Sequence, residues 1–154
     1  MTRTAAREIA VRICFLLSES EGDAQEILKE FFDGEYYASL AGEDELFREY
    51  PDDQQLAYIR QLIDGIGEHN QELNAYIEKY ARSWKFGRIS RTALAIMKTA
   101  MYEVLYMPDV PDSAAINEAV ELAKKYEEPR TVPFINGVLG SFAREEKQSE
   151  EPTL

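Results

Sequence analysis

The chain has 154 residues, which is enough for one domain or for two small helical halves that share a core. Hydrophobic residues make up 45% and charged residues 30% of it, which is typical of a globular protein and excludes a disordered chain. No apolar run reaches the roughly 18 residues of a membrane span, and no secretory signal is found. We therefore expect a cytoplasmic protein without membrane contact, and the single cysteine, Cys14, fits a reducing compartment.

The formal net charge of −12 is unevenly distributed along the chain. Residues 1–82 hold 8 Lys and Arg against 18 Asp and Glu, whereas residues 83–154 hold 9 against 11. Such a surface repels a phosphate backbone, so any RNA binding requires a local basic patch or a basic partner protein. The alternative is that the acidic residues only keep the protein in solution.

Apolar residues recur with a helical period along almost the whole chain, which predicts an all-α protein of about seven helices. Thr2 or Thr4 caps the first helix, which ends by Gly22. Asp23 and Glu26 have the spacing of a capping box and begin the second helix.

The acidic segment 33–52 contains glycine and proline and is predicted to be a loop, with one helical turn around Leu46 and Phe47. A third helix follows, with its apolar stripe between Leu56 and Ile66, and Gly65 and Gly67 should loosen its end. A fourth helix extends from about Leu73 to Trp84.

Prolines separate the last three predicted helices. The fifth starts after Gly87 and ends before Pro108, and the sixth starts at Asp112 or Ser113 and ends before Pro129. The seventh begins at Thr131, and Pro133 is tolerated in its first turn. Within it, Gly137 predicts a close crossing with another helix, because glycine otherwise weakens a helix interior.

We expect one helical domain over residues 1–144, followed by a polar tail over residues 145–154 that frays. Its first sub-bundle covers about residues 1–82 and its second about residues 83–144.

The sequence favours no enzymatic function. His69 is the only histidine and Cys14 the only cysteine, so no His/Cys metal cluster can form, and no metal or cofactor is expected. Gly65 and Gly67 do not follow a strand and lack the third glycine of a dinucleotide-binding loop. A lone histidine beside a helix break is interpreted as a surface or capping residue.

Arg3 and Arg7 are the candidate anion-binding residues. They are four residues apart on the first helix, so they share one face beside the positive end of the helix dipole. Two arginines at a helix N-terminus can hold one or two phosphates. The alternative interpretation is ordinary solvated surface charge.

The C-terminal half contains a more specific pattern. Trp84 and Arg88 precede the run INEAVELAK over residues 116–124 and the run FINGVL over residues 134–139. In order and spacing, these residues resemble the NusB family of transcription antitermination factors, most closely over residues 84–142.

The resemblance implies seven helices in two small bundles and a non-catalytic function. Family members pair with NusE, a ribosomal protein that also acts in transcription, and bind the boxA RNA element. The complex then modifies the transcribing RNA polymerase, chiefly on ribosomal RNA operons, so the polymerase is an indirect partner.

The resemblance also implies particular RNA contacts. The arginine-rich N-terminal segment of the family corresponds to Arg3 and Arg7, and the loop before the last helix holds Arg130. Family members often begin with adjacent basic residues and often have lysine where this chain has Pro133. Because these changes weaken the basic patch, we expect weak RNA binding in the absence of NusE.

The start of the fifth helix contributes to the NusE contact in the family, which implies a role for Arg91, Ala93 and Leu94. An acidic-basic pair is usual where this chain has Ala93 and Leu94, so one charged contact with the partner is altered. A divergent protein-interaction module with little RNA binding is the alternative function. A homodimer also remains open, whereas the chain is too short to include a methyltransferase domain of the kind fused to related helical domains.

Overall fold

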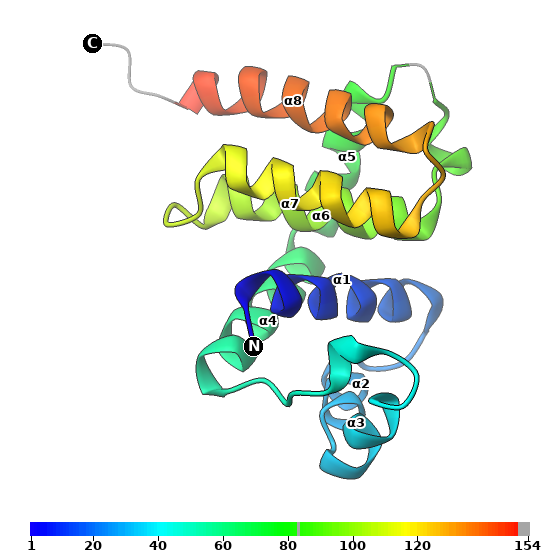
Figure 1. Ribbon diagram of the computed structural model, residues 1–154. Coiled ribbons are helices and arrows are strands. Elements are labelled where there is room, and N and C mark those ends of the chain that lie inside the picture. The colour runs from blue at the N-terminus through cyan, green and yellow to red at the C-terminus, as the bar shows by residue number, and fades with distance from the viewer. Residues whose placement is uncertain (83, 151–154) are drawn as a thin grey trace. The chain divides into compact units, whose positions relative to one another are not determined.

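The computed structural model describes residues 1–82 and 84–150, and their side chains through residue 147. These residues form eight α-helices and two short 3-10 helices, without a strand (Figure 1). The predicted all-α class is confirmed, with one helix more than the seven expected.

The chain divides into two compact units, Met1–Ile63 and Asp64–Leu154. This division falls earlier than the expected one at residue 82, because α5 contacts α6 and α8 of the second unit. The first unit contains α1 (Arg3–Glu19), α2 (Ala24–Phe31), α3 (Gly34–Leu40), η1 (Glu45–Phe47) and most of α4 (Asp53–Glu68). The second contains the end of α4, α5 (Asn70–Tyr80), η2 (Phe86–Arg88), α6 (Arg91–Tyr106), α7 (Asp112–Tyr126) and α8 (Thr131–Glu150).

Polar caps begin the helices of the first unit. The Thr2 hydroxyl accepts a hydrogen bond from the Ala5 N–H at the start of α1. The Asp23 carboxylate caps α2 in the same way, and Asp33 caps α3. Each cap satisfies a backbone N–H that has no partner inside its helix.

The prediction of a loop over residues 33–52 is wrong in part, because α3 forms within it; η1 corresponds to the predicted turn at Leu46 and Phe47. Tyr37 of α3 is only 2% exposed. Its ring centroid lies 5.0–6.2 Å from those of four other aromatic rings, which belong to Phe31, Phe32, Phe47 and Tyr50. This aromatic cluster stabilises a short helix that local propensity alone does not predict.

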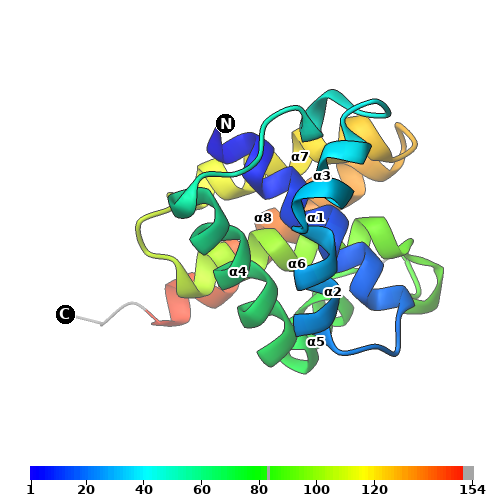
Figure 2. The same ribbon diagram turned by 90° about the horizontal axis from the view of Figure 1, so that it is seen from below.

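The second unit is built around α6, whose apolar face is buried along most of its length. Helices α6, α7 and α8 contact one another pairwise, and α5 covers α6 and α8 (Figure 1). Figure 2 gives a second view of these helices. The Lys98 ammonium donates a hydrogen bond to the Asn70 side chain (2.8 Å), and the Tyr106 hydroxyl donates to the Glu72 carboxylate (2.8 Å), which joins α6 to α5.

Gly65 and Gly137 have the opposite roles to those predicted: the close contact between helices was expected at Gly137 and is found at Gly65. Gly137 is exposed, and a Cβ added there would meet no described atom within 4 Å, so the predicted close crossing is wrong. Gly65 does not loosen α4, which continues to Glu68. Instead, a Cβ at Gly65 would lie 2.1–2.3 Å from ring and hydroxyl atoms of Tyr102. The close approach between helices is therefore at Gly65.

The end of α8 is ordered by contacts with neighbouring helices rather than frayed from residue 145. The Lys79 ammonium lies 2.7 Å from a Glu146 carboxylate oxygen, and the Tyr80 hydroxyl donates to that oxygen at 2.8 Å. The Lys147 ammonium contacts Asp112 of α7 at 2.7 Å. Residues 151–154 of the predicted tail lie outside the described residues.

The contact at Glu146 should make the stability of the second unit depend on pH in the acid range. Hydrogen bonds from Lys79 and Tyr80 lower the pKa of Glu146 below its ordinary value of 4.5. The folded pKa is therefore below the unfolded one, so the stabilisation is complete above pH 4.5 and is lost as pH falls through the folded pKa. We expect Glu146→Gln to remove part of this acid sensitivity.

The measurement is a series of urea unfolding curves of both proteins at decreasing pH, from neutral to strongly acidic. Glu78→Gln, which changes an exposed carboxylate of α5, is the matched control. Equal acid sensitivity of the Glu146→Gln protein and the original protein would contradict the prediction.

Candidate nucleic-acid and partner-binding sites

Arg3 and Arg7 lie together on α1, as their spacing predicts, and both face Tyr58 of α4. The guanidinium carbon of Arg3 is 4.1 Å from the centroid of the Tyr58 ring, and that of Arg7 is 5.7 Å from it. A cation over an aromatic face is held by the quadrupole of the ring. Tyr58 therefore orients this pair of arginines.

The two arginines differ in their access to solvent. Arg3 is exposed, whereas Arg7 is 5% exposed. Beside them, Glu45 and Glu49 help to line a pocket of about 340 Å³ at the start of α1. Glu49 pairs with the N-terminal ammonium at 2.6 Å and Glu45 with Arg48 at 3.4 Å, so these carboxylates are already paired with cations. Arg3 is therefore the residue of the pair that can receive a phosphate directly.

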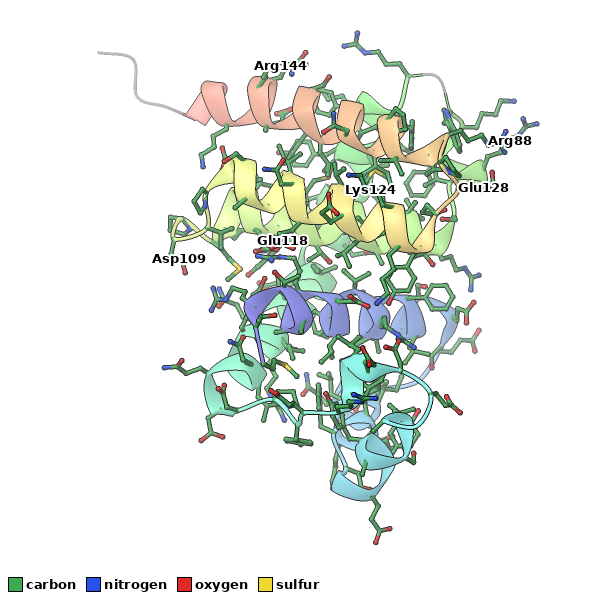
Figure 3. All side chains as sticks on the ribbon, viewed as in Figure 1. Arg88, Asp109, Glu118, Lys124, Glu128 and Arg144 are labelled. Atoms are coloured by element: carbon green, nitrogen blue, oxygen red, sulfur yellow. The ribbon has the colours of Figure 1, made fainter. Side chains whose placement is uncertain are left out.

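Arg130 lies in the turn between α7 and α8, and its guanidinium is 3.0 Å from the Glu128 carboxylate. Together with Trp84, Lys85 and Arg88 it lines a pocket of about 480 Å³. Figure 3 shows Arg88 and Glu128 at the same end of the second unit. We refer to Trp84, Lys85, Arg88 and Arg130 as the basic pocket.

The basic pocket has the chemistry of a nucleic-acid contact. Trp84 is half-buried and stacks on Phe134 of α8, with ring centroids 4.6 Å apart. Lys85 and Arg88 are exposed, and neither has an ion-pair partner among the described residues. Cations can hold phosphates while a fixed aromatic face stacks a base.

The family resemblance implied Arg130, whereas Lys85 and the stack of Trp84 on Phe134 were not predicted. The cluster of aromatic and basic residues from Trp84 to Arg88 was an available signal. Its link to Arg130 depends on the fold, which brings η2 beside the turn between α7 and α8.

The three residues implied for the partner contact lie in the first turn of α6. The Ser90 hydroxyl caps this helix by accepting a hydrogen bond from the Ala93 N–H at 3.0 Å, and it also donates to Glu127. Arg91 is exposed, Leu94 is half-buried and Ala93 is 1% exposed. Of these three residues, Arg91 and Leu94 therefore provide accessible side-chain surface, whereas Ala93 does not.

His69 occupies the N-cap position of α5 but makes no capping bond with its side chain. Its ring stacks on Tyr106 at 4.2 Å, and its Nδ1 lies 3.3 Å from Glu72. Cys14, the single thiol, is half-buried. Within residues 1–82 and 84–147, no His, Cys, Asp and Glu side chains cluster in a way that could hold a metal ion. No helix of the described part is long and apolar enough to cross a membrane.

Comparison with known proteins decides the family, since the model of the NusB family matches residues 4–144. The chain belongs to the NusB family. It is 35% identical to the transcription antitermination protein NusB of Clostridium kluyveri, over 96% of this chain and 98% of that protein. It is 32% identical to that of Clostridium novyi, over 94% and 99% respectively. The resemblance found in residues 84–142 is therefore confirmed and extends over nearly the whole chain.

Solved structures support the NusB fold directly. T. maritima NusB superimposes with a TM-score of 0.77 at 26% identity, covering 98% of this chain and 99% of that one. The solution structure of NusB from Aquifex aeolicus has a TM-score of 0.68 at 19% identity, covering 99% and 94%, and shows the fold alone. Membership of the NusB family assigns transcription antitermination to this chain, a role that is not enzymatic.

Proposed function

We propose that this NusB-family protein acts as an RNA-binding adaptor, which holds a boxA-type RNA together with NusE and so modifies the transcribing RNA polymerase. The main support is the basic pocket, where three cationic side chains line a hollow together with Trp84, which stacks on Phe134, in a chain of net charge −12. Antitermination on ribosomal RNA operons in the cytoplasm is the corresponding biological setting.

The two units contribute different parts of this function. The first supplies Arg3, oriented by Tyr58, for one phosphate of the RNA. The second supplies Lys85, Arg88 and Arg130 for further phosphates and Trp84 for base stacking. NusE would contact the first turn of α6 at Arg91 and Leu94, and a basic partner would offset the acidic surface that repels RNA.

The test is titration of a labelled boxA-type RNA with the protein, alone and with its cognate NusE, at two salt concentrations. We expect tighter, salt-sensitive binding with NusE. Arg88→Ala should weaken RNA binding by about three- to tenfold, because the substitution removes a phosphate contact. It should also reduce the slope of log affinity against log salt concentration by about 1.

Arg144→Ala is the matched control, because it removes the same charge from α8 at a position that does not line the basic pocket (Figure 3). If Arg144→Ala and Arg88→Ala weaken RNA binding equally, only the net charge of the protein matters. That result would contradict RNA binding at the basic pocket. Capture of NusE without any RNA binding would favour the protein-interaction module. Failure to capture NusE would overturn the adaptor function itself.

A further inference from the structure

The surface of the first unit contains a groove that the proposed function does not use. It lies between the C-terminal end of α1, the helix α2 and the start of α3, and has a volume of about 880 Å³. Its apolar wall includes Leu16, Ile27, Phe31 and Tyr36. We refer to this feature as the acidic groove, because Glu26, Glu30 and Asp33 also line it, against one basic lining residue, Lys29.

Two apolar residues of the acidic groove are unusually exposed. Leu16 is 39% exposed and Tyr36 is 47% exposed, and they are two of only four large hydrophobic residues exposed among the described residues. Phe31 is 5% exposed and its ring centroid lies 6.1 Å from that of Tyr36. Exposed apolar side chains that meet over a hollow with charged neighbours are typical of an interaction surface.

The acidic residues of the groove leave an excess of negative charge on α2, although Glu26 lies in the first turn, where the helix dipole favours it. Glu26 and Glu30 are one turn apart on α2 and repel each other, and Glu30 lies near the negative end of the helix dipole. Neither carboxylate has an ion-pair partner within the described part of the chain. From Glu19 to Glu45 the sequence holds ten acidic residues and one basic residue, Lys29.

We propose that the acidic groove binds a basic amphipathic helix of a partner protein. Leucine-like side chains on one face of that helix would contact Leu16, Ile27 and Tyr36. Lysine or arginine side chains beside them would pair with Glu26 and Glu30. This arrangement places apolar anchors in a groove and complementary charges at its rim.

Charge excludes the other occupants of such a groove. The carboxylates repel the phosphates of RNA and the anionic surface of a membrane. A second copy of this chain would bring a net charge of −12 to a surface that is itself acidic. The lining residues of the groove belong to the first unit, whereas Arg91 and Leu94 belong to the second.

The test uses the full chain, labelled with ¹⁵N, and two synthetic amphipathic peptides of the same apolar pattern. One has lysine and the other has glutamine at the polar positions. We expect the Leu/Lys peptide to shift the amide resonances of Leu16, Ile27 and Tyr36. The Leu/Gln peptide should bind at least about fivefold more weakly, because it lacks the ion pairs.

Variants of the groove distinguish a site from general attraction between opposite charges. The double variant Glu26→Gln and Glu30→Gln should bind the Leu/Lys peptide about fivefold more weakly. The matched control, Glu21→Gln with Glu43→Gln, changes two exposed acids that do not line the groove and should leave the affinity unchanged within about twofold. Tyr36→Ala should also weaken binding, through loss of an apolar anchor.

Equal weakening by both double variants would overturn the proposal, as would equal binding of the two peptides. Resonance shifts confined to residues outside the groove would overturn it too. Displacement of the peptide by NusE would identify the groove as part of the NusE contact. That result would contradict the proposal that the groove binds a different partner. Loss of RNA binding in the basic pocket leaves this result unaffected, because the titration contains no RNA.

Discussion

Replacing Tyr37 by alanine is expected to lower the free energy of unfolding by about 3–5 kcal/mol, which is the usual cost of removing a buried aromatic ring. The ring is 2% exposed and lies against four aromatic rings of the first unit. The cavity left behind cannot close easily, because residues of α2, α3, η1 and the loop after η1 meet at this point. A domain of ordinary stability loses much of its folded population under such a change.

The measurement is urea unfolding followed by circular dichroism. Tyr37→Phe keeps the ring and removes only the hydrogen bond that the hydroxyl donates to the Glu49 carbonyl oxygen at 2.8 Å. It should therefore cost only about 1 kcal/mol. Tyr36→Ala, at a neighbouring tyrosine that is 47% exposed, should cost less than about 1 kcal/mol. Equal effects at Tyr36 and Tyr37 would contradict the proposed aromatic cluster.

Alkaline pH offers an independent check on the same residue. Burial raises the pKa of Tyr37 to about 12 from its ordinary value of 10.0. Because the folded pKa is the higher one, the contribution to stability is complete below pH 10 and is lost as pH rises towards 12. Tyr37→Phe should remove this part of the alkaline destabilisation, and a tyrosine that titrates near its ordinary value would argue against burial.

Two Gly→Ala substitutions in helices are expected to have opposite effects. In Gly65→Ala, the new Cβ would lie 2.1 Å from the Cζ atom of Tyr102, whose ring is held beside Tyr106 and His69. Such overpacking costs about 1–3 kcal/mol, which outweighs the gain in helix propensity of about 1 kcal/mol. Gly137→Ala meets no described atom within 4 Å and should stabilise α8 by about 0.5–1 kcal/mol.

A double-mutant cycle separates the steric clash from other effects of Gly65→Ala. In a Tyr102→Ala background the ring is absent, so the substitution at Gly65 should become stabilising. The readout is again the free energy of unfolding from urea curves. If Gly65→Ala destabilises both backgrounds equally, the clash with Tyr102 does not cause the loss of stability. The close approach of α4 and α6 would then not explain why glycine occupies position 65.

The sequence determined those features that depend on nearby residues. The apolar period of about 3.6 residues identifies a helix because it reflects one buried face, and this predicted the all-α class. Asp23 caps α2 as predicted, since a cap acts on the adjacent turn, and α8 begins at Thr131 as expected. The motifs between residues 84 and 142 also identified the NusB family, which the comparisons confirmed.

Only the tertiary structure decided where local sequence preferences are overridden by contacts with distant residues. The acidic segment forms α3 because Tyr37 enters an aromatic cluster built by distant residues, a gain that local propensity does not contain. Gly65 rather than Gly137 permits close contact, because the neighbour at each position belongs to another part of the chain.

The same distinction applies to the candidate sites. Spacing on one helix placed Arg3 and Arg7 on a shared face, but the fold decided that Arg3 is exposed and Arg7 is buried. The basic pocket joins η2 to the turn before α8, and these segments are far apart in sequence. Sequence periodicity reports which face of a helix is buried, whereas the neighbours of that face depend on how the helices pack together.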